Sequence, residues 1–290
     1  MSYNIIGIGE ILWDLLPGGK KVPGGAPANF AYVASQLGNN GIILSRVGTD
    51  TAGIDLLLHL NAKRVSKDYI QDDPKNPTGK VDIRFENGQP RYEIVEQVAW
   101  DFLELSGTWR AIATQTDAVC FGSLAQRNPI SRETILEFVK LTRNLRIFDV
   151  NLRQKFFSVE ILRESLDIAD VVKLNHEELP VVAQMFEIKN QKPVQAAREM
   201  ISRFDLELVC VTRGAGGSVL VTKNELSENA GLNVAVADTI GAGDAFTAAL
   251  VSGLLRGWNL DKINEFANKV GAFVASQTGA MPGFPEEFKQ

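Results

Sequence analysis

Cysteine and histidine are scarce in this sequence, with two of each among 290 residues. Cys120 and Cys210 each lie inside an apolar run, which indicates buried thiols in strands rather than a disulfide framework. So few cysteines suit a reducing cytosol, and we therefore expect a cytoplasmic protein. His59 and His176 have no metal-ligand partner at a useful spacing, so we assign neither histidine a role.

Basic clusters and long apolar runs are also missing. The net charge is −5, and a nucleic acid or an anionic membrane needs a concentrated positive face, so neither partner is expected. No run approaches the roughly 18 apolar residues of a membrane-spanning helix, and residues 1–4 lack the basic region of a signal peptide. Apolar residues make up 45% of the chain and charged residues 22%, which is the balance of a globular protein with a large core.

Two common nucleotide-binding signatures are absent. No Walker A sequence occurs, which argues against a P-loop ATPase. The segment Gly7–Leu12 begins like a dinucleotide-binding fingerprint, but Leu12 stands where the third glycine belongs. Asp14 then comes far too early for the ribose-binding acid, which is expected roughly 20 residues further on. A dinucleotide-dependent oxidoreductase is therefore a poor fit.

What the sequence does contain is a regular alternation of short apolar runs with helix-like stretches. This alternation predicts βαβ units, and therefore an α/β fold with a doubly wound, mostly parallel sheet and helices on both faces. The expected strands are Ile5–Ile8, Ile42–Val47, Ala118–Leu124, Ile147–Val150, Val171–Leu174 and Leu206–Val211. The expected helices are Pro27–Leu37, which ends at Gly38; Ser131–Leu145, with Ser131 as N-cap; and Pro193–Phe204, with proline in its first turn.

Residues 78–99 break this alternation. Apolar and polar residues alternate over Val81–Phe85, and Asn87-Gly88 then favours a hairpin turn before a second strand. Such a hairpin has no place in a parallel core. We interpret residues 13–22 and 78–99 as a small antiparallel β lid on a single domain that spans residues 1–290. The alternative is an edge hairpin without function.

The segment Asp238–Phe246 carries the strongest chemical signal. Its Gly241-Ala242-Gly243 stretch precedes an apolar helix, Ala245–Leu255, and such small residues let a ligand approach the backbone closely. The first N–H groups of a helix are unpaired and partly positive, which makes this turn an anion site. Asp244 is well placed there to take a proton from an attacking hydroxyl, as one carboxylate does in phosphoryl transfer. The alternative is an ordinary N-cap aspartate before a core helix.

Two further stretches suit phosphates and a metal ion. Thr212–Gly217 is glycine-rich and connects two strand-like runs, although a tight turn between strands also needs glycines. Asn175 and Glu178 follow an expected strand at the edge where parallel sheets bind ligands. They can meet across one helical turn and hold a hydrated Mg²⁺, which needs only one or two carboxylates. A helix start with solvated acids is the alternative.

Polar residues near the N-terminus suit a polyol. Gly24 and Gly25 let a ligand approach the helix that follows, and Asn29 offers a donor and an acceptor from its first turn. Together with the Asp14 carboxylate, these groups match adjacent sugar hydroxyls, which need both acceptors and donors. Arg153 follows another expected strand and can clamp a phosphate or a carboxylate, with a plain surface arginine as the alternative.

These motifs together resemble the ribokinase-like (PfkB-type) carbohydrate kinases. Gly24–Asn29 is similar to the N-terminal signature of that family, and Asp238–Phe246 is similar to its C-terminal signature. Asn175–Glu178 matches its Asn-x-x-Glu element, and Thr212–Gly217 matches its nucleotide-side turn. The four motifs occur in the order of the family and span most of the chain. The resemblance implies a doubly wound α/β fold with a β lid and an ATP-dependent sugar kinase.

The resemblance also implies roles for individual residues. Many members of the family bind K⁺ near the anion site through carbonyl oxygens and an aspartate. The resulting assignments are Asp14, Gly25, Asn29 and Arg153 for the sugar; Asp244 as base, with Gly241, Ala242 and Gly243 around the developing anion; Asn175, Thr212, Gly214, Gly217 and Asn268 for ATP; Glu178 for Mg²⁺ through water; and Asp238 and Ile240, with the loop 276–283, for K⁺.

The substrate is less closely defined. Trp13–Pro17, Pro77–Gly79 and Asp149–Arg153 are most similar to the fructokinase branch, which implies fructose as the acceptor. The 2-keto-3-deoxygluconate kinases share several of these features, but their paired tyrosines followed by arginine are not seen at Arg91–Ile94. A non-catalytic sugar-binding protein on this fold is a further alternative, against which the intact Asp244 argues. The sequence leaves open a homodimer through the lid edge.

Overall fold

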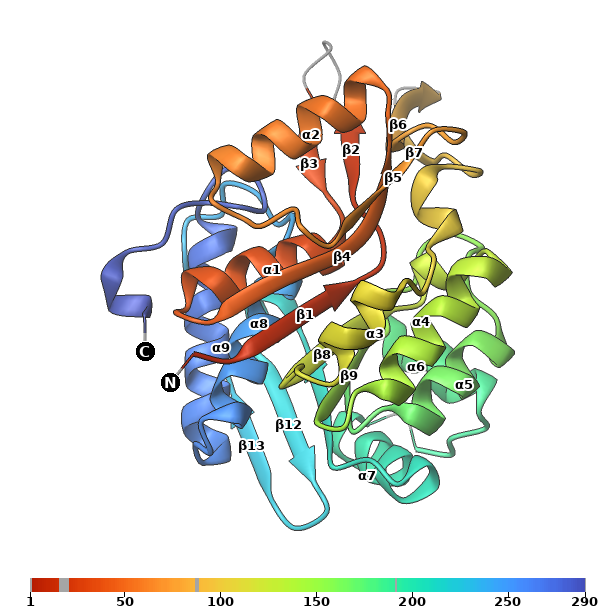
Figure 1. Ribbon diagram of the computed structural model, residues 1–290. Coiled ribbons are helices and arrows are strands. Elements are labelled where there is room, and N and C mark those ends of the chain that lie inside the picture. The colour runs from red at the N-terminus through yellow and green to blue at the C-terminus, as the bar shows by residue number, and fades with distance from the viewer. Residues whose placement is uncertain (1, 16–20, 87–88, 191, 290) are drawn as a thin grey trace.

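The computed structural model describes residues 2–15, 21–86, 89–190 and 192–289, which form two sheets flanked by helices (Figure 1). The larger sheet has nine strands among these residues, in the order β13-β12-β11-β10-β9-β8-β1-β4-β5. Among the described strands, only β12 runs antiparallel to the direction of the others, so the expected doubly wound, mostly parallel sheet is confirmed. The strands are β1 (Asn4–Ile8), β4 (Asn40–Gly48), β5 (Ile70–Asp73), β8 (Ala118–Gly122), β9 (Leu145–Asp149), β10 (Val171–Asn175), β11 (Leu208–Thr212), β12 (Ser218–Thr222) and β13 (Leu226–Asn229).

Helices cover both faces of the large sheet (Figure 1). Successive side chains of a strand point to opposite faces, so Ile5 packs in the core with α1, α8 and α9, whereas Ile6 packs in the core with α3–α7. The helices are α1 (Ala26–Gln36), α2 (Thr51–Ala62), α3 (Gly107–Ala113), α4 (Pro129–Leu141), α5 (Val159–Ile168), α6 (Glu178–Met185), α7 (Pro193–Phe204), α8 (Ala242–Leu255) and α9 (Leu260–Ala275). Within the described ranges, none of them is long and apolar enough to cross a membrane.

The carboxyl ends of the parallel strands meet at one edge of the large sheet. From β1 the chain passes to β4 and β5 on one side, and it later returns to β8 on the other side of β1. Ligands of doubly wound folds bind at the carboxyl edge where the strand order reverses in this way. The polar residues that follow β1, β9 and β10 therefore gather at the position expected for a ligand site.

The smaller sheet has the order β3-β2-β6-β7. Its strands are β2 (Leu12–Leu15), β3 (Lys21–Gly24), β6 (Gly79–Glu86) and β7 (Gln89–Ile94). The outer pairs are antiparallel, whereas the central pair β2–β6 is parallel. The expected small sheet is thus present, and it is built from both predicted segments. The predicted Asn87-Gly88 turn and residues 16–20 lie outside the described residues.

Polar contacts hold the chain where it enters and leaves the small sheet. Thr78, just before β6, donates its hydroxyl to Asp50 Oδ1 at 2.6 Å. Arg127 donates to the carbonyl of Val95, just after β7, at 2.6 Å and pairs with Asp101 at 2.7 Å. Arg127 and Asp101 are both buried, where a charge pair with good hydrogen bonds has strict geometry. These contacts fix the two ends of the β6–β7 hairpin to the segments that follow β4 and β8.

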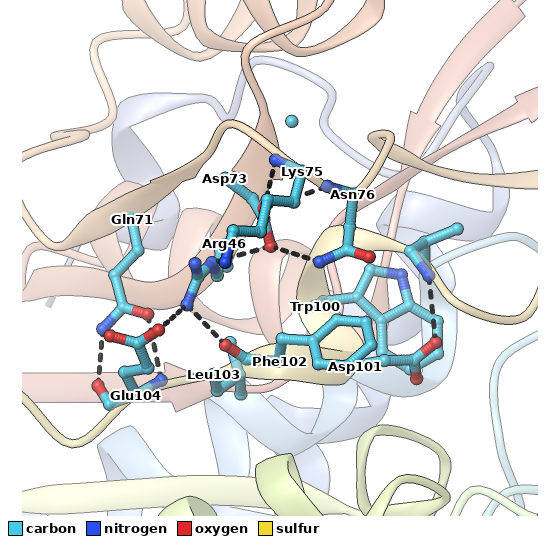
Figure 2. A network of polar contacts seen from close by, with 12 residues as sticks. Arg46, Gln71, Asp73, Lys75, Asn76, Trp100, Asp101, Phe102, Leu103 and Glu104 are labelled. Carbon is cyan, nitrogen blue, oxygen red and sulfur yellow. Dashed lines mark hydrogen bonds and ion pairs between the residues drawn. The ribbon is translucent and has the colours of Figure 1, made fainter.

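Arg46 of β4 joins the segments on either side of the small sheet (Figure 2). Its guanidinium lies 3.0 Å from Asp73 at the end of β5, and it donates to the carbonyl of Phe102 at 2.6 Å. Burial raises the pKa of Asp73, but hydrogen bonds from Asn76 outweigh this effect, so the pKa lies below its ordinary value. Asp73 is therefore ionised, and its contacts with Arg46 and Asn76 hold the chain just before it enters the small sheet.

Helix α4 differs from its prediction at both ends. Asn128, not Ser131, is the N-cap, and its side chain accepts a first-turn N–H at 3.0 Å. Ser131 is buried and donates its hydroxyl to the carbonyl of Trp100 at 2.8 Å. The helix ends at Leu141, and Leu145, predicted as its last residue, begins β9 after the polar connection Thr142–Asn144. The predicted strands were correct to within about two residues at each end.

Candidate active site

A cavity of about 1040 Å³ opens at the carboxyl edge of the large sheet, next to the small sheet. Its wall is formed by the small sheet, the first turns of α1 and α8, the segments after β9–β11, and one side of α9. The predicted site residues in this wall are Asp14, Gly25, Asn29, Arg153, Asn175, Glu178, Thr212, Gly214, Gly217, Ile240, Gly241, Ala242, Gly243, Asp244 and Asn268. Residues far apart in the sequence therefore surround one space, as the motifs predict.

Asp244 lies in the first turn of α8, in the middle of the cavity wall. The N-cap of this helix is Gly241, so Asp244 is the third helical residue and the N-cap alternative is wrong. Asn29 of α1 donates its amide to Asp244 Oδ2 at 2.8 Å, which orients the carboxylate. Burial raises the pKa of Asp244 to about 6, and the nearby charge of Asp149 adds to the rise. The group is thus an oriented carboxylate that can accept a proton near neutral pH.

Two glycines allow the helices α1 and α8 to begin at the cavity. Gly25 is the N-cap of α1, with φ 109°, and a Cβ there would lie 2.4 Å from the carbonyl oxygen of Glu10. Gly241 has φ 77°, and a Cβ there would lie 2.5 Å from the Cβ of Ala280. No other residue fits either position without a shift of the backbone. Two helix N-termini, each with partly positive N–H groups, therefore face the same space.

The carboxyl groups of Glu10 and Asp14 and the exposed guanidinium of Arg153 lie at the end of the cavity near the small sheet. Asp14 on β2 lies over Gly24, since a Cβ on Gly24 would come within 2.3 Å of its Oδ2. Burial raises the pKa of Asp14 to about 6, and the positive charge of Arg153 opposes the rise. The same guanidinium acts on Glu10 and Asp244. Sequence analysis did not single out Glu10, although it lies two residues after the end of β1 at the ligand edge.

Lys173 and its partner Asp149 form a second feature that sequence analysis missed. Lys173 of β10 is buried, and its Nζ lies 3.0 and 3.1 Å from the two carboxylate oxygens of Asp149. Thr247 donates its hydroxyl to Asp149 Oδ2 at 3.0 Å. A Cβ on Gly243 would lie 3.3 Å from Nζ, so the ammonium group sits directly beneath the glycine turn. The available signal was a lysine within the apolar strand Val171–Asn175, which needs a buried partner.

Asn175 and Glu178 meet as predicted, through a reciprocal set of hydrogen bonds. The Asn175 side chain accepts the N–H of Glu178 at 2.9 Å, and Glu178 Oε2 accepts the N–H of Asn175 at 2.8 Å. Glu178 Oε1 also accepts the N–H of Leu152 at 2.9 Å. The carboxyl group is therefore held in a fixed position, and its two oxygens keep lone pairs for a water molecule. In the part of the chain that the structure describes, no group of three or more acidic, histidine or cysteine side chains could hold a bare metal ion.

The far end of the cavity is glycine-rich. Gly214–Gly216 forms a 3₁₀ turn between β11 and β12, so the predicted strand-to-strand turn is present. Gly217 has φ 79°, and a Cβ there would lie 2.0 Å from the carbonyl oxygen of Asn229. The backbone geometry therefore requires glycine at this position whether or not a ligand binds there. Asn268 of α9 donates its amide to Ser218 Oγ at 2.7 Å. This end offers small residues and backbone groups rather than charge.

Asp238 lies outside the cavity wall and fixes two loops. Its Oδ1 accepts the N–H of Ile240 at 3.0 Å, and its Oδ2 accepts the N–H of Gly279 at 3.2 Å. The aspartate thus joins the turn before α8 to the loop 276–283, as the predicted K⁺ site requires. These contacts hold the backbone and do not test ion binding, so the K⁺ role of Asp238 and Ile240 stays a prediction.

The fold and the cavity define a class of protein: a doubly wound α/β kinase that acts on small molecules, with a carboxylate at a helix N-terminus between a polar and a glycine-rich end. Residues 14–287 match the description "pfkB family carbohydrate kinase", and the chain belongs to that family. It is therefore a sugar kinase, and the resemblance stated from the motifs is confirmed.

Individual relatives agree with the family assignment. A protein of Pyrococcus horikoshii described as "an uncharacterized sugar kinase" is 34% identical over 95% of this chain and 91% of its own length. Its structure in complex with ATP has a TM-score of 0.82 and covers 96% of this chain and 94% of that one. The fructokinase of Escherichia coli is 28% identical, with 98% and 97% covered. A fructokinase of Vibrio cholerae O395, solved in a form with bound fructose, ADP and calcium, is 28% identical with a TM-score of 0.81, covering 98% and 96%.

Proposed function

We propose that this sugar kinase transfers the γ-phosphoryl group of ATP to a terminal hydroxymethyl group of fructose. The observation that carries this proposal is the position of Asp244. It lies at the N-terminus of α8, between the carboxyl-rich end of the cavity and its glycine-rich end. A hydroxyl held at the first end and a phosphate held at the second would meet above this carboxylate. The ATP-bound and fructose-bound relatives support the same arrangement.

The charges at the sugar end support a neutral substrate. Lys173 is already paired with Asp149, so Arg153 is left to face the carboxyl groups of Glu10, Asp14 and Asp244 in the described part of the wall. A surplus of negative charge disfavours a substrate that carries its own carboxylate or phosphate. Carboxylate and amide groups instead suit the adjacent hydroxyls of a neutral ketose.

The phosphates would lie against the first turn of α8. The N–H groups of Gly243 and Asp244 belong to that turn, where a helix leaves its N–H groups without internal partners. Such fixed donors stabilise negative charge that develops on a transferring phosphoryl group. The buried charge of Lys173 lies beneath the same turn and strengthens this field. Asp244 would take the hydroxyl proton as the sugar oxygen attacks.

Glu178 and Asn175 would hold a hydrated Mg²⁺ that is bound to the ATP phosphates. A fixed carboxylate with free lone pairs fits a water-bound ion, because Mg²⁺ gives up its water reluctantly. The ion would neutralise charge on the phosphates. Thr212, Gly214 and Gly217 would line the rest of the nucleotide path, and Asn268 the adenine side.

A comparison of two substrates tests the choice of sugar. We expect kcat/KM for fructose to exceed that for 2-keto-3-deoxygluconate by at least about tenfold, because a site built for several hydroxyls rejects a sugar that lacks one and adds a charge. Steady-state coupled assays with both compounds measure the ratio. A preference for the sugar acid would overturn fructose as substrate, while the family assignment would stand.

Replacing Glu178 with glutamine tests the metal site. Glutamine keeps the size of the side chain but loses the charge, so we expect the Mg²⁺ concentration at half-maximal rate to rise by about tenfold. The same change at the exposed neighbour Glu177 is the matched control and should leave that concentration unaltered. If both variants titrate with Mg²⁺ like the parent enzyme, Glu178 only holds the start of α6.

We further propose that the small sheet is a lid that closes over bound sugar. Leu12, Val81 and Ile94 bring apolar side chains from this sheet to the cavity, where they can exclude water from phosphoryl transfer. Amide hydrogen exchange over residues 79–86 should slow severalfold when fructose binds. The strand β8 in the large sheet provides the internal reference. Equal exchange in β6 with and without sugar would contradict a lid.

A further inference from the structure

Glu10 is a buried carboxyl group whose chemistry the proposed reaction leaves unused. It lies two residues after the end of β1, and only 2% of its surface is exposed. Its Oε1 accepts the N–H of Ala26, the first residue of α1, at 3.3 Å. Its Oε2 has no hydrogen-bond partner among the residues that the structure describes. A buried, unpaired carboxyl oxygen is costly, so a task at the site is the physical reason for keeping it.

A second, much smaller cavity lies behind the site and connects Glu10 to the proposed base. Its volume is about 10 Å³, which is close to the space that one water molecule needs. Glu10 and Asp244 both line it, and so do Asp149 and Asn151. The remaining wall includes Phe30 together with other apolar side chains. A water there would have the two to four polar partners that buried waters usually have.

We propose that Glu10 receives, through one water molecule in this small cavity, the proton that Asp244 removes from the sugar. The inference rests on the proposed role of Asp244 as base. The sugar O–H bond breaks and its proton passes to Asp244, while the sugar oxygen bonds to the γ-phosphorus and the bond from that phosphorus to ADP breaks. Asp244 then gives a proton to the water, which gives another to ionised Glu10. Asp244 is ionised again, and Glu10 releases its proton to solvent after the products leave.

The electrostatics around Glu10 bring both carboxyl groups into the range where they exchange protons near neutral pH. Burial raises the pKa of Glu10 to about 7, with the charge of ionised Asp244 adding to the rise, and burial raises the pKa of Asp244 to about 6. The charged or titratable groups that surround Glu10 are Asp244 on α8, Asp149 at the end of β9, its partner Lys173 on β10, Arg153 after β9, Asp14 on β2 and the neutral thiol of Cys120 on β8.

A structural role for Glu10 as a cap of α1 can be separated from proton transfer by a conservative change. In Glu10→Gln the amide oxygen still accepts the N–H of Ala26, but the side chain no longer takes up a proton. The variant Glu10→Ala loses both functions. We expect Glu10→Gln to keep the thermal midpoint of the parent and Glu10→Ala to lower it.

The deciding measurement is kcat as a function of pH for the parent and Glu10→Gln with saturating ATP and fructose. At about pH 8, where Glu10 of the parent is ionised, we expect kcat of the variant to be lower by at least about tenfold. At about pH 6, where Glu10 of the parent is mostly protonated, the two rates should converge to within about twofold. Equal loss at every pH, unchanged kcat at every pH, or a raised fructose KM with unchanged kcat would each overturn the relay. Should Asp244→Asn prove inactive while Glu10→Gln follows the parent profile, the relay alone would fail and the base would stand.

Discussion

Asp244→Asn is expected to lower kcat by at least about a hundredfold with little change in the affinity for sugar, because a positioned acid–base group contributes about 10²–10⁴ in rate. Asparagine has the same shape, and its oxygen can still accept a hydrogen bond from the Asn29 amide, whose nitrogen lies 2.8 Å from Asp244 Oδ2. Only the ability to take up a proton is lost. Single-turnover kinetics with ATP and fructose measure the chemical step, and calorimetry of fructose binding supplies the control.

The pH dependence of the rate provides a second test of the role of Asp244. Burial and the charge of Asp149 raise the pKa of Asp244 to about 6, and only the ionised form can act as base. The rate should therefore fall as pH decreases through about 6, and this limb should vanish from the residual activity of Asp244→Asn. Near-normal turnover of Asp244→Asn would contradict the assignment of Asp244 as the base.

Removing the buried charge of Lys173 should have the largest effect on stability. In Lys173→Met the carboxylate of Asp149 loses its cation while it stays buried, and breaking such a pair costs about 3–5 kcal/mol. Burial lowers the pKa of Lys173, but the charges of Asp149, Glu178 and Asp244, together with the hydrogen bond to Asp149, raise it by more, so the folded value lies above the ordinary one. The stabilisation is thus fully present below about pH 10.4 and is lost only as pH rises through the higher folded pKa. Urea unfolding at neutral pH measures the difference.

The double variant Lys173→Met with Asp149→Asn provides the control for that measurement. It removes both charges, so no uncompensated ion is left in the core, and we expect it to regain much of the stability that the single change removes. Kinase activity should stay low in the double variant, because the positive field beneath Gly243 is still missing. If the single and double variants are equally stable, the pair is not the source of the effect.

Local sequence patterns predicted the parts of the site that rest on backbone geometry. Gly25 and Gly241 each precede a helix, and their φ angles of 109° and 77° explain why glycine stands there. Asn29 was predicted to face the sugar, but the structure shows that its amide also holds Asp244. That contact joins α1 to α8, and no spacing along the chain reveals it.

The parts that were missed depend on pairing between strands. Lys173 and Asp149 are direct neighbours in the register of β10 and β9, so their ion pair follows from the strand order and not from either segment alone. The start of α4 was also predicted wrongly for a tertiary reason. Ser131 was predicted as the N-cap, but its buried hydroxyl instead donates to the carbonyl of Trp100 in a distant segment. Tertiary contacts decide the role of such residues, and the local preference of a residue type only limits the possible roles.

The parallel pairing of β2 with β6 has a consequence for heat inactivation. These strands are separated in the chain by β3, α1, β4, α2 and β5, so their pairing closes a long loop. We therefore expect the small sheet to open at a free-energy cost below that of global unfolding. Such an opening would carry Asp14 away from the cavity while the large sheet stays folded. Activity on heating should accordingly disappear some degrees before the calorimetric transition, and it should return on cooling.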